Sequence, residues 1–338
     1  MLLASMLLSV GLIGPATSAA GRPIVLDLPV RCELGRTCFV QQYFDHDNGP
    51  GATDYRCGVM VYDGHDGTDI RVPTLTDQRR GVDVVAAAPG VVARLRDGMA
   101  DVDIRLAGET SVTGRECGNG VTITHAGGWQ TQYCHMAKDS VRVHANQKVE
   151  TGTVLGTLGE SGAAAFPHLH FTVMHDGRKV DPFAWDAPLG ACGVGNGLWS
   201  RTATRALTYH SPDVINMGFS AAPVSLADVE SGRAAAAAPN QASPVMTAYV
   251  RAIGLAAGDS AHLTLLEPDG AVLAEGDMPA LTRNRAEQLL FVGARRRGNV
   301  WPSGVYRLAF VVHRGGRPAL SRSANLTLPE PPSQPSQP

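Results

Sequence analysis

Polar and apolar side chains alternate along residues 166–173, which read Phe-Pro-His-Leu-His-Phe-Thr-Val. Alternation with β-branched and aromatic residues predicts a strand. Successive side chains of a strand point to opposite faces, so we expect His168 and His170 to share one face with Thr172. The opposite, apolar face should hold Leu169, Phe171 and Val173. An H-x-H strand is often only the solvated side of a sheet, so these imidazoles indicate a site only if other segments supply partners.

A second polar segment follows a short apolar run at residues 59–62, predicted to be a strand. It reads Asp63-Gly64-His65-Asp66-Gly67-Thr68-Asp69, and strand character resumes at Ile70. Two glycines within seven residues disfavour a helix, so we predict a strand, a loop and a strand. A tight turn can bring His65 and Asp69 to one point. The alternative is an Asp/Gly-rich turn with an exposed histidine.

A third segment, residues 118–136, is predicted to be a hairpin that turns at Gly127-Gly128. With the turn centred there, Cys134 lies opposite Val121, on the face that also holds Ile123 and Gln132. Tyr133 and His135 then point away from this apolar side. In that register a Cys117–Cys134 disulfide requires an irregularity at residues 118–120.

The remaining pattern is also that of strands and turns. Residues 81–95 predict two buried strands joined at Pro89-Gly90, and residues 149–162 predict short strands between glycines. From residue 204 onward about seven strand-like runs follow, which is typical of an immunoglobulin- or fibronectin-like β-sandwich. Residues 234–238, all alanine, are short and flanked by Gly232 and Pro239, so a loop is expected there.

We therefore predict an all-β protein with two domains. The predicted divisions are a signal peptide at 1–20, a first domain with an N-terminal extension at 21–203, a sandwich at 204–328 and a disordered tail at 329–338. The apolar part of the leader ends at Pro15, which is too short to span a bilayer. Export with cleavage is therefore favoured over a membrane anchor.

Composition supports export and argues against one class of partner. Six cysteines, an even number and none in a C-x-x-C pair, lie within the first 192 residues and predict disulfides. Their connectivity stays open. The formal net charge of −2 argues against nucleic acid as the principal partner, because phosphate-binding proteins usually carry a clear basic excess.

Three separate segments thus offer metal-binding or proton-transferring groups: His65 with Asp69, His135, and His168 with His170. Two histidines and one carboxylate, with a fourth position left to water, form a catalytic zinc set. A structural zinc site is usually closed by four protein ligands. Zinc lowers the pKa of bound water to roughly 7, and imidazoles beside it can take a proton and deliver one to a leaving amine.

Residues 62–181 resemble the M23 family of zinc metallopeptidases, the lysostaphin and LytM type that cut peptide bonds in bacterial peptidoglycan. The resemblance rests on five motifs in family order. They are H-x-G-x-D at residues 65–69, Ala-Pro-Gly-Val-Val, the Gly-Asn-Gly-Val-Thr-Ile-Thr-His hairpin ending in Tyr-Cys-His, the glycine-rich segment, and Pro-His-Leu-His-Phe. Departures from the family pattern occur at Cys134, Met136 and residues 163–166. They leave the ligands unchanged and affect what the resemblance implies about the shape of the substrate groove.

The resemblance implies that the first domain is a LytM/lysostaphin-type antiparallel β peptidase. His65, Asp69 and His170 would bind Zn²⁺, and His135 and His168 would be the catalytic pair. The expected activity is hydrolysis of peptide bonds in peptidoglycan cross-links or stem peptides by metal-activated water, in the periplasm or outside the cell. We also expect a wall or protein partner for the sandwich and no membrane span after signal cleavage.

Two alternatives remain open. One is a non-hydrolytic LytM-like regulator or activator of cell-wall amidases, and the other is proteolysis of proteins instead of wall peptides.

Export and the even cysteine count predict that the mature protein contains no free thiol. Alkylation of the unreduced, denatured protein followed by mass measurement should detect no labelled cysteine. A labelled cysteine would contradict both the disulfide and the compartment predictions.

Overall fold

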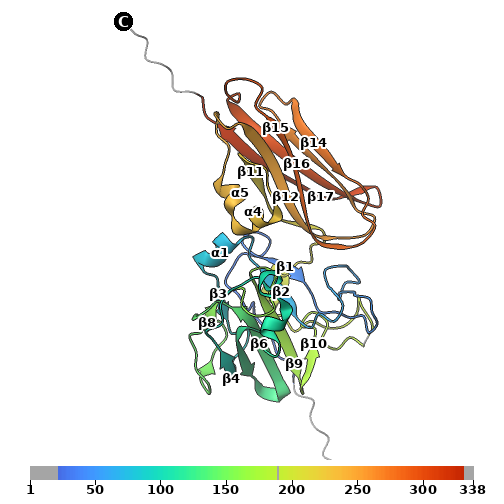
Figure 1. Cartoon of the computed structure of the whole chain (residues 1–338). Coiled ribbons are helices and arrows are strands. Elements are labelled where there is room, and N and C mark those ends of the chain that lie inside the picture. Colours follow the sequence, from blue (N-terminus) through green and yellow to red (C-terminus); the bar gives the residue numbers. More distant parts are fainter. Residues whose placement is uncertain (1–21, 189, 331–338) are drawn as a thin grey trace, which may run out of the picture.

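The computed structural model describes residues 22–188 and 190–330. The predicted signal peptide and nearly all of the predicted tail lie outside the described residues. The strands gather into two bodies stacked end to end, which Figure 1 shows in blue to green and in yellow to red. We call them the N-terminal body (β1–β10) and the C-terminal body (β11–β17). No helix among the described residues has the length and apolar character needed to cross a membrane.

The N-terminal body is built on an eight-stranded antiparallel sheet with the order β1-β2-β9-β6-β5-β4-β7, to which β10 adds by pairing with β9. A separate two-stranded sheet pairs β3 with β8. The strands of this body are β1 (Phe39–Gln42), β2 (Thr68–Arg71), β3 (Asp83–Val85), β4 (Gly90–Arg96), β5 (Asn119–Thr124), β6 (Trp129–Met136), β7 (Lys148–Val149), β8 (Val154–Thr157), β9 (His168–His175) and β10 (Arg178–Val180).

Strand β9 has the alternation that its sequence predicts. Leu169, Phe171 and Val173 are fully buried and belong to the main core of this body. His168, His170 and Thr172 lie on the other face. Two predictions for other segments are wrong. Residues 59–62 form no strand. Residues 81–95 were predicted to form two buried strands, but in β4 only Val92 is buried, because the other side chains of this strand face outward.

The predicted register of the hairpin β5–β6 is wrong by one residue. Val121 lies opposite Tyr133, and Thr124 lies opposite Gln130. The turn is a short 3₁₀ segment, η2 (Ala126–Gly128), centred on Gly127, and a shift of one residue exchanges the two faces of a strand. Tyr133 is therefore in the core, while Gln132 and Cys134 share the open face with His170 and Thr172.

Three disulfides close the N-terminal body: Cys32–Cys38, Cys57–Cys192 and Cys117–Cys134. The described residues contain no free cysteine. The Cys117–Cys134 bridge is accompanied by the expected irregularity, because the ladder between β5 and β6 is interrupted between Asn119 and Val121 and Gly118 has a φ of 63°.

The C-terminal body is a sandwich of a three-stranded sheet, β11-β12-β15, and a four-stranded sheet, β14-β13-β16-β17. Side chains from both sheets share one apolar cluster. All seven predicted runs are strands, so the predicted sandwich is confirmed. The strands are β11 (Asp213–Ser220), β12 (Val245–Leu255), β13 (Ser260–Leu266), β14 (Val272–Met278), β15 (Arg285–Arg295), β16 (Gly304–Arg314) and β17 (Arg317–Leu328).

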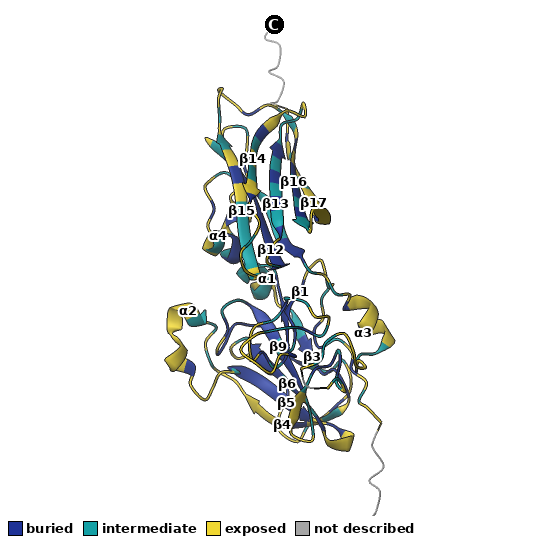
Figure 2. Ribbon diagram, turned by 90° about the vertical axis from the view of Figure 1, so that its right-hand side faces the viewer, coloured by how far each residue is buried: buried dark blue, intermediate teal, exposed yellow. Residues whose placement is uncertain are grey.

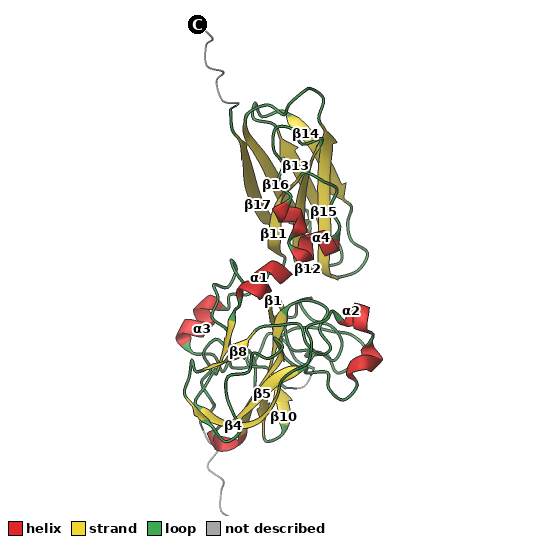
Figure 3. Ribbon diagram, turned by 60° about the vertical axis from the view of Figure 1, so that its left-hand side comes forward, coloured by secondary structure: helices red, strands yellow, loops and turns green. Residues whose placement is uncertain are grey.

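Helices are short and lie outside the sheets, as Figure 3 shows. They are α1 (Leu75–Arg80), α2 (Ile104–Ala107), η1 (Glu109–Val112), α3 (Arg201–Ala206), α4 (Leu226–Ser231) and α5 (Arg233–Ala236). The expected loop at residues 234–238 is wrong, because α5 forms directly after α4. Ala234 is buried with Val229 and Tyr249, and this packing stabilises a helix too short to form alone.

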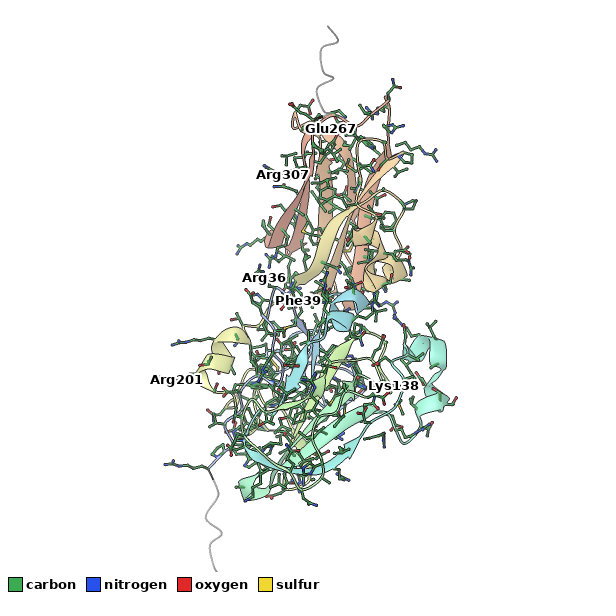
Figure 4. The ribbon with its side chains drawn as sticks, turned by 90° about the vertical axis from the view of Figure 1, so that its left-hand side faces the viewer. Arg36, Phe39, Lys138, Arg201, Glu267 and Arg307 are labelled. Atoms are coloured by element: carbon green, nitrogen blue, oxygen red, sulfur yellow. A yellow bond between two sulfur atoms is a disulfide. The ribbon has the colours of Figure 1, made fainter. Side chains whose placement is uncertain are left out.

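The two bodies meet through both apolar and charged side chains. Phe39 and Met60 pack with Ile215 and Ile253 in a small buried cluster, and Figure 4 places Phe39 at the junction. Beside this cluster, Arg71 of β2 is fully buried, and its guanidinium donates to both carboxylate oxygens of Glu230 at 3.0 Å.

The charged cluster at the junction has two further members. Arg251 of β12 is also fully buried and pairs with both Glu230 and Glu287. Arg71 donates in addition to Gln41 at 2.6 Å. Two arginines and two glutamates thus balance one another where the bodies touch.

Glu230→Gln should lower the free energy of unfolding by about 3–5 kcal/mol, because it leaves two buried guanidinium groups with too little negative charge. Urea unfolding followed by circular dichroism measures this. Glu33→Gln is the matched control: Glu33 pairs with Arg36 at the surface, and its loss should cost less than about 1 kcal/mol. Equal effects in the two variants would show that the junction does not depend on this cluster.

Candidate metal centre

Strands β2 and β9 place the central residues of the site side by side. Asp69 lies opposite His170, and Arg71 lies opposite His168. His65 comes from the loop before β2, which reaches the site through Gly67. A Cβ atom on Gly67 would lie 2.6 Å from Nε2 of His170 and 2.8 Å from the carbonyl oxygen of Phe171. The glycine of the H-x-G-x-D motif is therefore required by close packing against β9.

Three potential ligand atoms converge at this point. The Oδ1 atom of Asp69 is 2.9 Å from Nδ1 of His170 and 3.2 Å from Nε2 of His65, and the two nitrogen atoms are 3.3 Å apart. In a tetrahedral site with bonds of roughly 2.0–2.1 Å, ligand atoms lie about 3.3 Å apart. The three atoms therefore fit the triangular face of a tetrahedral metal site. No other group of this kind occurs in residues 22–188 and 190–330.

Hydrogen bonds behind these side chains fix their orientation. Nδ1 of His65 donates to the carbonyl oxygen of Tyr43 at 2.6 Å, which leaves Nε2 as the ligand atom. Nε2 of His170 lies 3.2 Å from Oδ1 of Asp66 and 3.0 Å from Oγ1 of Thr172, which leaves Nδ1. Partners of this kind hold ligating imidazoles in the required tautomer.

Sequence reasoning did not identify Asp66 as part of the site. Its position within the H-x-G-x-D motif, next to His65, was the available signal. Its partner Lys179 on β10 forms an ion pair with it, and this contact spans 113 residues, so no local pattern indicates it.

Carboxylates make the centre attractive to a cation. Burial alone would raise the pKa of Asp69, but His65 and His168 hold it well below its usual range. Burial alone would lower the pKa of His170, but hydrogen bonds to Asp66 and Asp69 raise it to about 9. The two shifts have complementary causes: neighbouring imidazoles favour the ionised form of Asp69, and the carboxylates of Asp66 and Asp69 favour the protonated form of His170.

His135 and His168 lie beside the three potential ligands. Their ring centroids are 4.6 Å apart, and Nε2 of His168 is 3.5 Å from Oδ1 of Asp69. His135 has a φ of 61°, so the interruption in the β5–β6 ladder turns its side chain toward the site. The structure thus brings together all five residues singled out in the sequence.

Both of these imidazoles have one nitrogen engaged with the backbone. Nδ1 of His135 donates to the carbonyl oxygen of Ser161 at 2.7 Å, and Nδ1 of His168 donates to that of Phe166 at 2.8 Å. A carbonyl oxygen only accepts, so each Nδ1 carries the proton and each Nε2 offers a lone pair. Burial lowers the pKa of His168 and holds that of His135 well below its usual range, so both rings are neutral bases near pH 7.

The aromatic ring of Phe166 connects the charged cluster at the junction with this site. The guanidinium of Arg71 lies over the ring of Phe166, 4.6 Å from its centroid. The Phe166 ring in turn lies 4.4 Å from that of His168. The residue that ties the two bodies together therefore also packs under the segment that carries His168.

Two buried histidines lie outside the group and have structural partners. His125 lies between the carbonyl oxygen of Pro89 and Oγ1 of Thr131. His46, which sequence reasoning did not consider, pairs with Asp181 at 2.7 Å and with the carbonyl oxygen of Ala191.

Part of the chain is similar to proteins of a known family. The model of Peptidase family M23 matches residues 63–182. The cell division protein DipM of Caulobacter vibrioides is 33% identical over 124 residues, which is 35% of this chain and 17% of DipM. The peptidoglycan DD-endopeptidase ShyA of Vibrio cholerae is 28% identical over 127 residues, 38% of this chain and 24% of ShyA. The chain thus spans less than a quarter of the length of these relatives.

Among solved structures, a zinc-containing peptidase from Vibrio cholerae aligns with 49% of this chain and 40% of its own, at 24% identity and a TM-score of 0.31.

Asp66→Asn should weaken metal binding about tenfold, because it removes the charge that orients and polarises His170. Competition with a chromophoric chelator measures this, with Zn²⁺ as the probe ion. Asp63→Asn, in the same loop and without a contact to the three ligand atoms, should leave the affinity unchanged. Equal affinities for the two variants would mean that Asp66 does not support the centre.

Proposed function

On the premise that residues 63–182 belong to peptidase family M23, we propose that this chain is an exported zinc-dependent endopeptidase. Its substrates would be peptide bonds in peptidoglycan cross-links or stem peptides. The observation that carries this proposal is the convergence of His65, Asp69 and His170 within 3.3 Å, with two neutral imidazoles beside them. A metal site with bases but no fourth protein ligand suits hydrolysis better than a structural role.

His65, Asp69 and His170 would hold the zinc ion. When bound, zinc polarises a peptide carbonyl and lowers the pKa of a water molecule. Asp69 supplies the negative charge of the ligand set, and Asp66 and Tyr43 keep the two imidazoles oriented.

His135 and His168 would move the protons. Their Nδ1 atoms are engaged by backbone carbonyls, so only Nε2 can exchange a proton with water or substrate. A neutral imidazole can accept a proton from the attacking water and return it to the amine nitrogen that leaves. These hydrogen bonds would hold both rings in place and leave each Nε2 free to act on a bound substrate.

Export is proposed on the chemistry of the cysteines. Three disulfides persist in an oxidising compartment, which for a wall-directed enzyme is the periplasm or the exterior. We further propose that the sandwich predicted at residues 204–328 is a separate domain with a wall or protein partner. The proposed boundary between residues 203 and 204 falls inside α3, so the connecting segment is more suitably placed at residues 207–212.

Alanine variants should separate ligands from proton carriers. His170→Ala removes one of three ligands, so zinc content and activity should both fall. His168→Ala and His135→Ala should retain zinc but lower turnover by roughly 10²- to 10⁴-fold, as expected when a general acid or base is lost. Zinc stoichiometry of the purified variants, measured beside their rates on peptidoglycan, tests this.

His125→Ala provides a control, because His125 is buried but does not belong to the site. Loss of zinc from His168→Ala with retention in His170→Ala would reverse the assignment. Wild-type rates in all variants would show that these histidines do not carry the activity, and zinc binding without any cleavage by the wild type would favour the non-hydrolytic regulator or activator of amidases. Cleavage of proteins without cleavage of wall peptides would favour the protease alternative.

A further inference from the structure

A groove lies on the main sheet, on the side of the sheet that β4 closes. It has a volume of about 240 Å³ and lies over β4, β5 and β6. Figure 2 shows that β4, at this side of the sheet, is largely exposed while β5 and β6 are buried. The polar side chains that line the groove are Arg94, Arg96, Thr122 and Gln132.

Sheet register links the polar residues of this groove to the centre. Thr172 lies opposite Gln132, Gln132 opposite Thr122, and Thr122 opposite Arg94. Residues that pair across antiparallel strands share a face, so these four side chains form one row. The row begins in contact with the site, because Oγ1 of Thr172 is 3.0 Å from Nε2 of His170.

Two arginines lie at the far end of this row: Arg94 is its last member, and Arg96 follows two positions along β4. Arg94 and Arg96 are exposed, and neither forms an ion pair with a carboxylate among the residues that the structure describes. Arg96 makes one long hydrogen bond, 3.4 Å, to the carbonyl oxygen of Gly118. Hydrogen bonds from backbone N–H groups and the charge of Arg96 lower the pKa of Glu116, but Glu116 is exposed and forms no ion pair with Arg96.

We propose that Arg94 and Arg96 form a subsite that binds a carboxylate of an acidic peptide substrate. This inference rests on the proposed peptidase function and adds to it a preference among peptides. Guanidinium groups bind carboxylates through paired, charge-assisted hydrogen bonds, and Thr122 and Gln132 offer hydrogen-bonding groups to the peptide between the subsite and the metal. The side chain or the end of the peptide can supply the carboxylate.

Strand spacing sets the position of that carboxylate. Three strand spacings of about 4.8 Å separate β9 from β4, which is roughly 14 Å. An extended peptide advances about 3.3–3.6 Å per residue, so the recognised carboxylate should lie about four residues from the bond that is cleaved. The subsite would therefore select substrates by charge without contacting the reacting atoms.

The test compares native muropeptides with the same muropeptides after their carboxylates are converted to amides. Amidation should raise KM for the wild-type protein roughly tenfold, with little change in kcat. The double variant R94Q/R96Q should show the raised KM on native muropeptides and no further increase on amidated ones. The control R31Q/R36Q changes two exposed arginines outside the groove and should behave as the wild type.

Binding is measured separately by calorimetry in the His168→Ala background, so that this readout does not require turnover. A preference for native over amidated muropeptides that disappears in R94Q/R96Q supports the subsite. Equal binding of both forms, or a preference that R94Q/R96Q retains, overturns it even if the protein cleaves peptidoglycan. Absence of cleavage by the wild type would instead contradict the proposed function, and the binding comparison would still decide on the subsite.

Discussion

One buried carboxylate, Asp69, is the constraint around which the N-terminal body is arranged. A charge removed from water is tolerated only when it is paired and hydrogen-bonded, and Asp69 is almost fully buried. His65, His168 and His170 surround it from the loop before β2 and from β9, so the antiparallel pairing of β2 with β9 is also the assembly of the site. The same negative charge is what makes a cation the natural occupant of this point.

The C-terminal body stabilises this arrangement through its ion pairs with Arg71 of β2. Arg71, which follows Asp69 by two residues on β2, is as deeply buried as Asp69, and its charge is balanced by Glu230 and Glu287 of the other body. Its guanidinium also lies over Phe166, next to His168. The sandwich therefore contributes to the surroundings of the site. A separate sandwich and a shared junction are compatible, because the main cores of the two bodies are distinct.

Local sequence patterns predicted the features that depend on neighbouring residues, namely the faces and the boundaries of strands. Alternation in β9 gave the two faces of the strand, and turn residues separated the seven strands of the sandwich. The hairpin register was wrong because Gly127 and Gly128 both have positive φ in a turn centred on one residue, and sequence does not distinguish this turn from a two-residue one. The helix α5 was missed because its four residues are too few to form a helix alone, and only the fold shows that Ala234 is buried against its neighbours. The contacts of Asp66 with Lys179 and of Arg71 with Glu230 join residues 113 and 159 positions apart, so only the fold reveals them.

Metal-dependent hydrolysis of wall peptides is the central claim, and product masses test it most directly. Purified protein is incubated with peptidoglycan under three conditions: in buffer alone, with a zinc chelator, and with the chelator followed by excess Zn²⁺. The masses of the soluble products are then measured by mass spectrometry. The account predicts muropeptides that differ from their precursors by hydrolysis of a peptide bond, absent with chelator and restored by Zn²⁺. Unchanged muropeptides under all three conditions, or cleavage that continues after zinc is removed, would contradict it.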